Sequence, residues 1–184
     1  MATESMRRHA GSPRPQPGSD EKPHEAESRP CGSVLRAALA DELVAAAVSL
    51  RDMLAGAHLD ESIDRHTRDL PSASAKAVRN MAYDATRQQG LLAWLGERFN
   101  RRQPTPLLAA LQALGMAQLI DARRPVPVII DQTVRAVGKL PEGAAHPGAA
   151  GFINATLRRF ARERASLMAE PLPDEARFNH PGWW

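Results

Sequence analysis

The sequence contains a single cysteine, Cys31, among its 184 residues. One thiol excludes an internal disulfide and any zinc site built from several cysteines. It also fits a reducing compartment, where free thiols persist. The sequence has no uninterrupted apolar run of the roughly 18 residues that a membrane span needs. Its first residues lack the apolar core of a secretory signal. We therefore expect a soluble, cytoplasmic protein.

Lysine is almost as scarce as cysteine. Only Lys22, Lys76 and Lys139 accompany the arginines that make up the rest of the 24 basic residues. These face 21 acidic residues, which leaves a net charge of +3 and a pI near 9.6. Such a balance permits a nucleic-acid partner but does not require one. Arginine does suit that role, because its planar fork matches phosphates and base edges.

Motifs of enzyme chemistry are also missing. The sequence has no HExxH, no GxSxG, no P-loop and no GxGxxG motif. The histidines are scattered, and we interpret His58 and His66, which lie near carboxylates, as surface residues. The other histidines are His9, His24, His146 and His180. We therefore predict no catalytic residue, no metal site and no cofactor site in this chain.

The first 32 residues differ in composition from the rest. They contain five prolines and almost no large apolar side chains, and their acidic and basic residues nearly cancel. Such a segment cannot bury enough apolar surface to offset the entropy of ordering it. We predict a disordered tail over residues 1–32 and a folded domain over residues 33–170.

The folded domain is predicted to be all-α. Apolar residues recur every three or four positions, and no segment alternates as a strand would. The helical segment that follows residue 105 is apolar on nearly all sides, so we expect it at the centre of a helical bundle. The predicted helices cover residues 33–55, 61–66, 75–89, 91–99, 106–121, 128–137 and 151–169.

Local signals predict several helix ends. Ser33 is a suitable N-cap for the first helix, and Ser72 or Ser74 for the third. Gly90 is expected to kink or end that third helix. The strongest start signal is Thr105, because it precedes a proline that fits the first helical position.

The stretch Gly151–Phe160 and its continuation predict a helix with two different faces. One face is apolar: Ile153, Leu157, Phe160 and Ala161. The opposite face is cationic: Arg158, Arg159 and Arg162. Arg164 falls on the apolar face, so we expect it to snorkel, to find a partner or to fray the helix.

Further cations lie near the ends of predicted helices. Such residues often only complement the helix dipole. If the clusters converge, they form a phosphate-binding surface suited to structured RNA. The candidate RNA-binding residues are Arg101, Arg102, Arg123, Arg124, Lys139, Arg158, Arg159 and Arg162.

Three motifs resemble the NusB-like domain family. They are Arg124–Pro127 (RPVP), Asp131–Val134 (DQTV) and Gly151–Arg158 (GFINATLR), and the last is similar to a "GFVNAVLR" motif. The region Asn80–Trp94 also looks like the third helix of that domain. Two kinds of protein carry the domain: NusB-type transcription antitermination factors, and 16S rRNA cytosine-C5 methyltransferases of the RsmB/Sun type at their N-terminus. Residues Ala176–Trp184 (ARFNHPGWW) are similar to the segment that leads into the methyltransferase's next region.

The resemblance implies six or seven helices in two packed subdomains that bind RNA, in particular 16S rRNA. Residues 171–184 would begin a linker to a catalytic domain. Neither the glycine-rich S-adenosylmethionine loop nor the catalytic cysteines have a counterpart here, so the resemblance implies a non-catalytic module without a cofactor. Gln132 departs from the family pattern, which usually has an acidic residue there.

Two alternatives to an rRNA-binding module remain open. One is an antitermination module that binds RNA and a ribosomal protein. The other is a helical interaction domain or homodimer without an RNA role. Asn154 could contact RNA or bond backbone between helices, and the second role is the one we favour. Trp183 and Trp184 are expected to be partly exposed.

Overall fold

A computed structural model describes residues 37–179, and within that range the chain is all-helical with no strand. This confirms the predicted fold class. The helices are α1 (Leu39–Leu54), α2 (Leu59–Thr67), α3 (Ser72–Arg87), α4 (Gln89–Phe99), α5 (Pro106–Asp121), α6 (Val126–Val137), α7 (Ala149–Ala169) and α8 (Asp174–Phe178).

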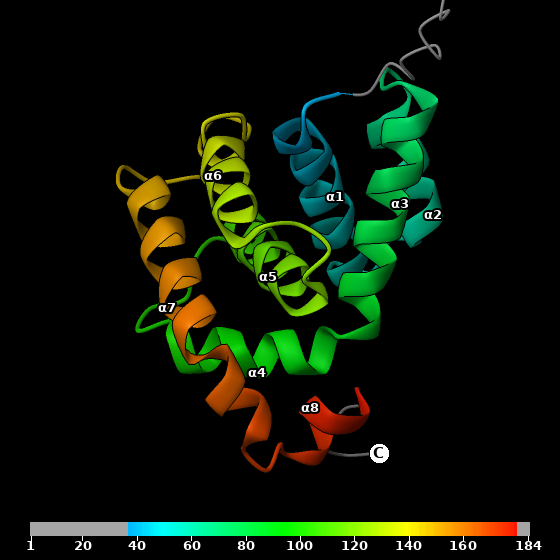
Figure 1. Cartoon of the computed structure of the whole chain (residues 1–184). Coiled ribbons are helices and arrows are strands. Elements are labelled where there is room, and N and C mark those ends of the chain that lie inside the picture. Colours follow the sequence, from blue (N-terminus) through cyan, green and yellow to red (C-terminus); the bar gives the residue numbers. More distant parts are fainter. Residues whose placement is uncertain (1–36, 180–184) are drawn as a thin grey trace, which may run out of the picture. The chain divides into compact units, whose positions relative to one another are not determined.

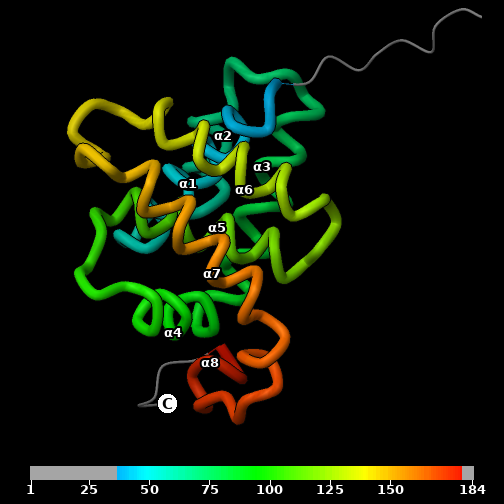
Figure 2. Tube along the Cα trace, turned by 60° about the vertical axis from the view of Figure 1, so that its left-hand side comes forward, coloured from blue at the N-terminus to red at the C-terminus, as the bar shows by residue number. Residues whose placement is uncertain are grey.

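The helices form two groups around a common core (Figure 1). Helices α1, α2 and α3 pack on one another, as do α5, α6 and α7, and α1 joins the groups by packing against both α5 and α6. This agrees with two packed subdomains. Helix α4 lies across one end of the bundle, and α8 lies on its far side in both views (Figures 1 and 2).

Helix α5 is central, as its sequence predicts. Eleven of its residues are buried, and Leu108, Leu111 and Leu114 have no exposed surface. The side-chain oxygen of Thr105 accepts a hydrogen bond from the backbone N–H of Leu108, which confirms the predicted N-cap. The helix starts and ends where its apolar pattern and its cap place it.

The apolar face predicted for α7 is also confirmed. Ile153, Leu157 and Phe160 are fully buried. Leu157 packs directly onto Gly115 of α5: a β-carbon at residue 115 would lie 2.9 Å from Cδ1 of Leu157 and 3.2 Å from Cγ2 of Thr133 in α6. The missing side chain therefore lets α6 and α7 both approach α5 closely.

The predicted starts of α1 and α3 are wrong. Helix α1 begins at Leu39, and Ala38 before it is extended, with φ −61° and ψ 145°. The backbone N–H of Ala37 donates 2.7 Å to Oγ of Ser74. That contact holds the chain outside the helix, and Ser74 is thereby a buried partner within α3 and not its N-cap. Ser72 is the first residue of α3 and does not cap it either.

Two further boundaries differ from the prediction. The break between α3 and α4 is at Gln88, with φ −109° and ψ 15°, and Gly90 lies in the first turn of α4. Helix α6 begins at Val126, two residues earlier than predicted, because a proline such as Pro127 is tolerated in a first turn, where its missing N–H costs no hydrogen bond. Helix α8, inside the predicted linker, was not predicted.

A polar network joins α1 to α2. Oδ2 of Asp52 accepts a hydrogen bond from Oγ of Ser62 at 2.7 Å and lies 2.9 Å from Nε2 of His66, while Arg51 pairs with Oδ1. Burial raises the pKa of Asp52, but the bonds from His66, Arg51 and Ser62 outweigh it and lower the pKa to about 2. His66, interpreted above as a surface residue, is partly buried and belongs to this network.

No helix among residues 37–179 has the length and apolar character to cross a membrane. The predictions for the tail over residues 1–32, for Cys31, for Ser33 and for Trp183 and Trp184 fall outside the described residues.

Leu157→Ala should lower the free energy of unfolding by about 2–5 kcal/mol, since it removes a fully buried side chain and leaves a cavity against Gly115. Leu54→Ala removes the same atoms from a side chain that is 52% exposed and should cost less than about 1 kcal/mol. Urea denaturation followed by far-ultraviolet circular dichroism measures both. Equal losses would contradict the burial of α7.

Asp52→Asn should destabilise the protein at neutral pH by on the order of 2 kcal/mol, because the Asp52 pKa is depressed to about 2. A depressed carboxylate pKa stabilises the fold above its unfolded value near 4 and loses that contribution as the pH falls toward 2. The difference in stability between wild type and Asp52→Asn should therefore shrink between about pH 4 and pH 2. Asp64→Asn, at an exposed carboxylate, is the control. A difference that persists at pH 2 would argue against the network.

Candidate nucleic-acid interface

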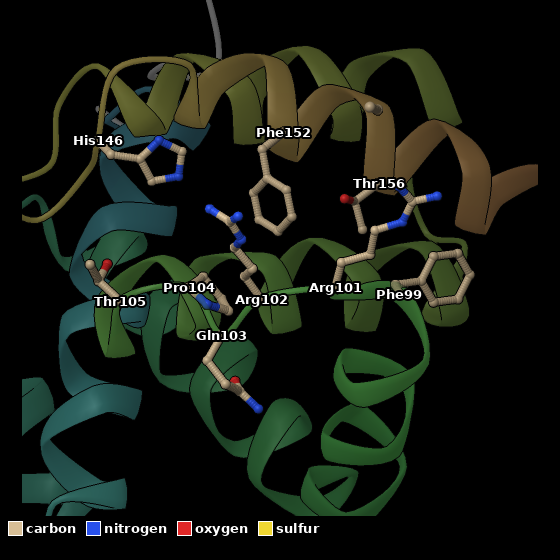
Figure 3. A pocket seen from close by; sticks show the side chains of 10 residues that line it. Phe99, Arg101, Arg102, Gln103, Pro104, Thr105, His146, Phe152 and Thr156 are labelled. Carbon is tan, nitrogen blue, oxygen red and sulfur yellow. The ribbon is translucent and has the colours of Figure 1, made fainter.

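A cleft of about 660 Å³ opens between the end of α4, the connection to α5, the loop before α7 and one face of α7 (Figure 3). We call it the α4–α7 cleft. Its lining residues are Phe99, Arg101, Arg102, Gln103, Pro104, Thr105, His146, Phe152, Ala155 and Thr156.

The side chains of the connection and of α7 face one another across this cleft. Arg101 and Arg102 extend toward α7, and Phe152 and Thr156 point back toward them, while Gln103 points away (Figure 3). His146 reaches the cleft from the loop before α7 (Figure 3). Two stretches of the chain, residues 99–105 and residues 146–156, therefore bring arginines and an aromatic ring to one space.

Arg159 extends the cationic character of the cleft beyond Thr156. It lies one turn further along α7, and its guanidinium carbon is 4.8 Å from the ring centroid of Phe99. Its Nε also donates to Glu163 at 2.9 Å. The Phe99 ring in turn meets Phe160 edge to face at 5.9 Å between centroids. A buried aromatic contact thus fixes the end of α4 against α7 next to the arginine.

Uncharged hydrogen bonds hold the frame of the cleft. Nδ2 of Asn100 donates to Oε1 of Gln112 at 3.1 Å, and Nε2 of Gln112 donates back to Oδ1 of Asn100 at 2.9 Å. The hydroxyl of Thr105 donates 2.6 Å to the carbonyl oxygen of Ala144. The two bonds between Asn100 and Gln112 fix the α4–α5 connection onto α5. The bond from Thr105 ties the loop that carries His146 to the start of α5.

The charge of the cleft is of one sign. None of its lining residues is acidic. Arg101 and Arg102 are exposed, and neither forms an ion pair with another residue in the range 37–179. Two planar cationic forks beside a partly exposed aromatic ring are suited to an anionic ligand with flat groups.

The arginine side of α7 that faces α6 forms a separate site. Arg158 and Asn154 line a depression of about 430 Å³ together with Val126, Ile130 and Asp131. Nε of Arg158 donates 2.9 Å to Oδ1 of Asn154. The amide of Asn154 therefore bonds a side chain of its own helix and not backbone between helices. Arg162 is exposed further along α7.

The remaining candidate cations lie elsewhere and have partners. Arg123 pairs with Asp121 at 2.7 Å, and Arg124 donates to Oε1 of Gln118 at 2.7 Å. Both line a depression of mixed charge between α3 and the end of α5. Lys139 pairs with Asp41 of α1 at 2.6 Å. Of the predicted RNA-binding residues, only Arg101 and Arg102 line the α4–α7 cleft, and Arg159 lies at its edge over the ring of Phe99.

Sequence reasoning did not assign Phe152, Thr156 or His146 to a site. Phe152 is only partly buried and faces the cleft. The spacing of Phe152, Thr156 and Arg159 places them on one helix face, which is the signal that was available. Arg164, expected to snorkel, to find a partner or to fray the helix, donates to the backbone carbonyl of Leu119 near the end of α5.

No three or more His, Cys, Asp or Glu side chains of the described residues group in a way that could hold a metal ion.

Comparison with known proteins finds one matching family and a set of similar proteins. Residues 34–162 match the model of the NusB family. The chain is 31% identical over 112 residues to ribosomal RNA small subunit methyltransferase B of Citrobacter koseri and 30% identical over 112 residues to that of Salmonella newport. Identity to the corresponding Salmonella arizonae protein is 28% over 109 residues. Each alignment covers 58% of this chain but 24% of the relative, so the chain spans about a quarter of the relatives' length.

Proposed function

The chain belongs to the NusB family, and we propose that it is an RNA-binding module whose binding site is the α4–α7 cleft. One observation carries the proposal: Arg101, Arg102 and the partly exposed ring of Phe152 line one cleft that has no acidic lining residue. The family match and the rRNA methyltransferase relatives support RNA as the ligand.

RNA offers negatively charged phosphates and flat aromatic bases, and the cleft offers cationic arginines and an aromatic ring. Arg101 and Arg102 would bind backbone phosphates through their planar forks, and release of the counterions of RNA adds to the affinity. Phe152 would stack a base, a contact that every base can make. Thr156 and His146 supply polar groups for a base edge or a ribose hydroxyl.

The shape of the cleft favours unpaired RNA. Its aromatic and cationic side chains point inward from both walls (Figure 3), and a base can reach Phe152 only when it is not paired and stacked within a duplex. Sequence-specific RNA recognition in general targets such loops and bulges. We therefore propose a single-stranded or looped segment as the ligand.

The relatives named above are ribosomal RNA small subunit methyltransferases. We propose 16S rRNA as the target and the cytoplasm as the location. In this proposal the module binds and positions RNA, and methyl transfer together with its cofactor S-adenosylmethionine belongs to a separate catalytic domain. No residue of this chain is assigned a role in that transfer.

The double variant Arg101→Ala/Arg102→Ala should weaken binding to a labelled single-stranded 16S rRNA fragment by about tenfold or more near 100 mM salt. Loss of two phosphate contacts should also reduce the slope of log Kd against log salt by about 1.4. Fluorescence anisotropy measures both quantities. Arg65→Ala, which removes an exposed arginine on α2 far along the chain from the cleft, is the control and should leave both unchanged.

A second arm tests whether RNA extends past the cleft along α7. Arg158→Glu/Arg162→Glu should weaken binding further if it does, since charge reversal repels phosphates. Full wild-type affinity in both double variants would contradict the proposed site. A wild-type protein that is dimeric by light scattering and has no RNA affinity at low salt would instead support the interaction-domain alternative.

A further inference from the structure

Residues 171–179 fold back onto α4 as a short segment that contains α8. We call it the C-terminal strap. Helix α4 contacts α5 on one side and α8 on the other, so it lies between the bundle and the strap (Figures 1 and 2). Only Leu92, Leu95 and Phe99 of α4 are buried. The strap covers part of the outer face of α4.

The end of the strap is fixed at the break between α3 and α4. Asn179 donates from Nδ2 to the carbonyl oxygen of Thr86 at 3.2 Å, and its Oδ1 accepts the backbone N–H of Gly90. That N–H is one of the amides at a helix start that have no partner within the helix. Asn179 itself has a φ of 56°, a conformation that asparagine tolerates better than most residues. One side chain thus bonds the last turn of α3 and the first turn of α4.

Gly90 makes this contact possible. A β-carbon at residue 90 would overlap the carbonyl oxygen of Glu175 and would lie 3.0 Å from its carbonyl carbon and 3.2 Å from Cα of Asn179. These are backbone atoms, which cannot move aside as a flexible side chain can. Gly96, which lies later in the same helix, has no such neighbour. The atom nearest to a β-carbon at residue 96 would be Nδ2 of Asn100, at 3.8 Å.

A second contact joins the residue that precedes the strap to the last turn of α4. Arg98 pairs with Glu170, which directly precedes the strap, at 3.1 Å, and its guanidinium carbon lies 5.4 Å from the ring centroid of Trp94. Ala176 of α8 is buried, with 6% of its surface exposed. The strap is thereby attached to both ends of the outer face of α4.

Helix α4 ends at Phe99, and Arg101 and Arg102 of the α4–α7 cleft follow directly after Asn100. The position of α4 therefore contributes to where Phe99, Arg101 and Arg102 lie relative to α7, together with the Phe99–Phe160 contact and the Asn100–Gln112 bonds. We propose that Gly90 and Asn179 are positioning residues: they clamp the strap onto the first turn of α4 and thereby fix the RNA-binding wall of the cleft. This inference rests on the proposed RNA-binding function.

Gly90→Ala should release the strap, whereas Gly96→Ala is the matched control in the same helix. Alanine favours a helix over glycine at an open position, so a strap that did not contact residue 90 would leave both variants alike. Hydrogen–deuterium exchange of residues 171–179 should accelerate about tenfold or more in Gly90→Ala only. The affinity for the single-stranded 16S rRNA fragment should fall about threefold to tenfold in the same variant.

Asn179→Gly gives an independent route to the same state. Glycine adopts the positive φ of residue 179 without strain, so this variant removes only the two side-chain hydrogen bonds and should release the strap with the fold intact. The slope of log Kd against log salt should become shallower in both variants, because displaced arginines contact fewer phosphates. A mere loss of stability would not change this slope. In the Arg101→Ala/Arg102→Ala background, Gly90→Ala should have little further effect on affinity.

The outcomes separate the inference from the proposed function. A released strap with unchanged RNA affinity and salt slope overturns the positioning role and leaves RNA binding in place. Unchanged exchange in both Gly90→Ala and Asn179→Gly overturns the clamp. If wild type binds no RNA, the proposed function fails, while the exchange experiment still tests the clamp on its own.

Discussion

Burial of α5 on nearly all sides is the constraint on which the rest of the structure depends. A helix without a polar face must be covered on every side, and α1, α3, α4, α6 and α7 supply that cover. Gly115 lets two of them approach closely at once. The two ends of α5 reach the surface of the bundle. At its start, the capping residue Thr105 lines the α4–α7 cleft. Near its end, the backbone carbonyl of Leu119 accepts a hydrogen bond from Arg164 of α7.

The helices that were predicted well are those whose signals are local. The cap at Thr105 and the apolar face of α7 follow from neighbouring residues, and both were found. The errors arise where a distant partner decides. Ser74 resembles a cap, but it serves a backbone amide 37 residues earlier in the chain. Helix α8 has only five residues, too few for a periodic pattern, and it is stabilised by contacts with α4 that no local signal reports.

The cleft was only partly accessible from the sequence. Clusters of arginines can be recognised in the sequence, but which of them lie together in space depends on how each helix is oriented. Arg158 and Arg159 are adjacent in the sequence, yet they lie on different sides of α7. The first faces α6 with Asn154, and the second faces Phe99. The aromatic side chain of Phe152 could not be distinguished from core, because a ring at the edge of a cleft has the same spacing as a buried one.

The reciprocal amide pair between Asn100 and Gln112 makes the frame of the cleft insensitive to the salt concentration. Both of its hydrogen bonds are neutral, so dissolved salt screens neither of them, whereas the attraction between arginine and phosphate weakens steeply with ionic strength. For the proposed RNA ligand, release at high ionic strength would therefore leave the frame of the cleft intact, and rebinding would need no refolding of that frame.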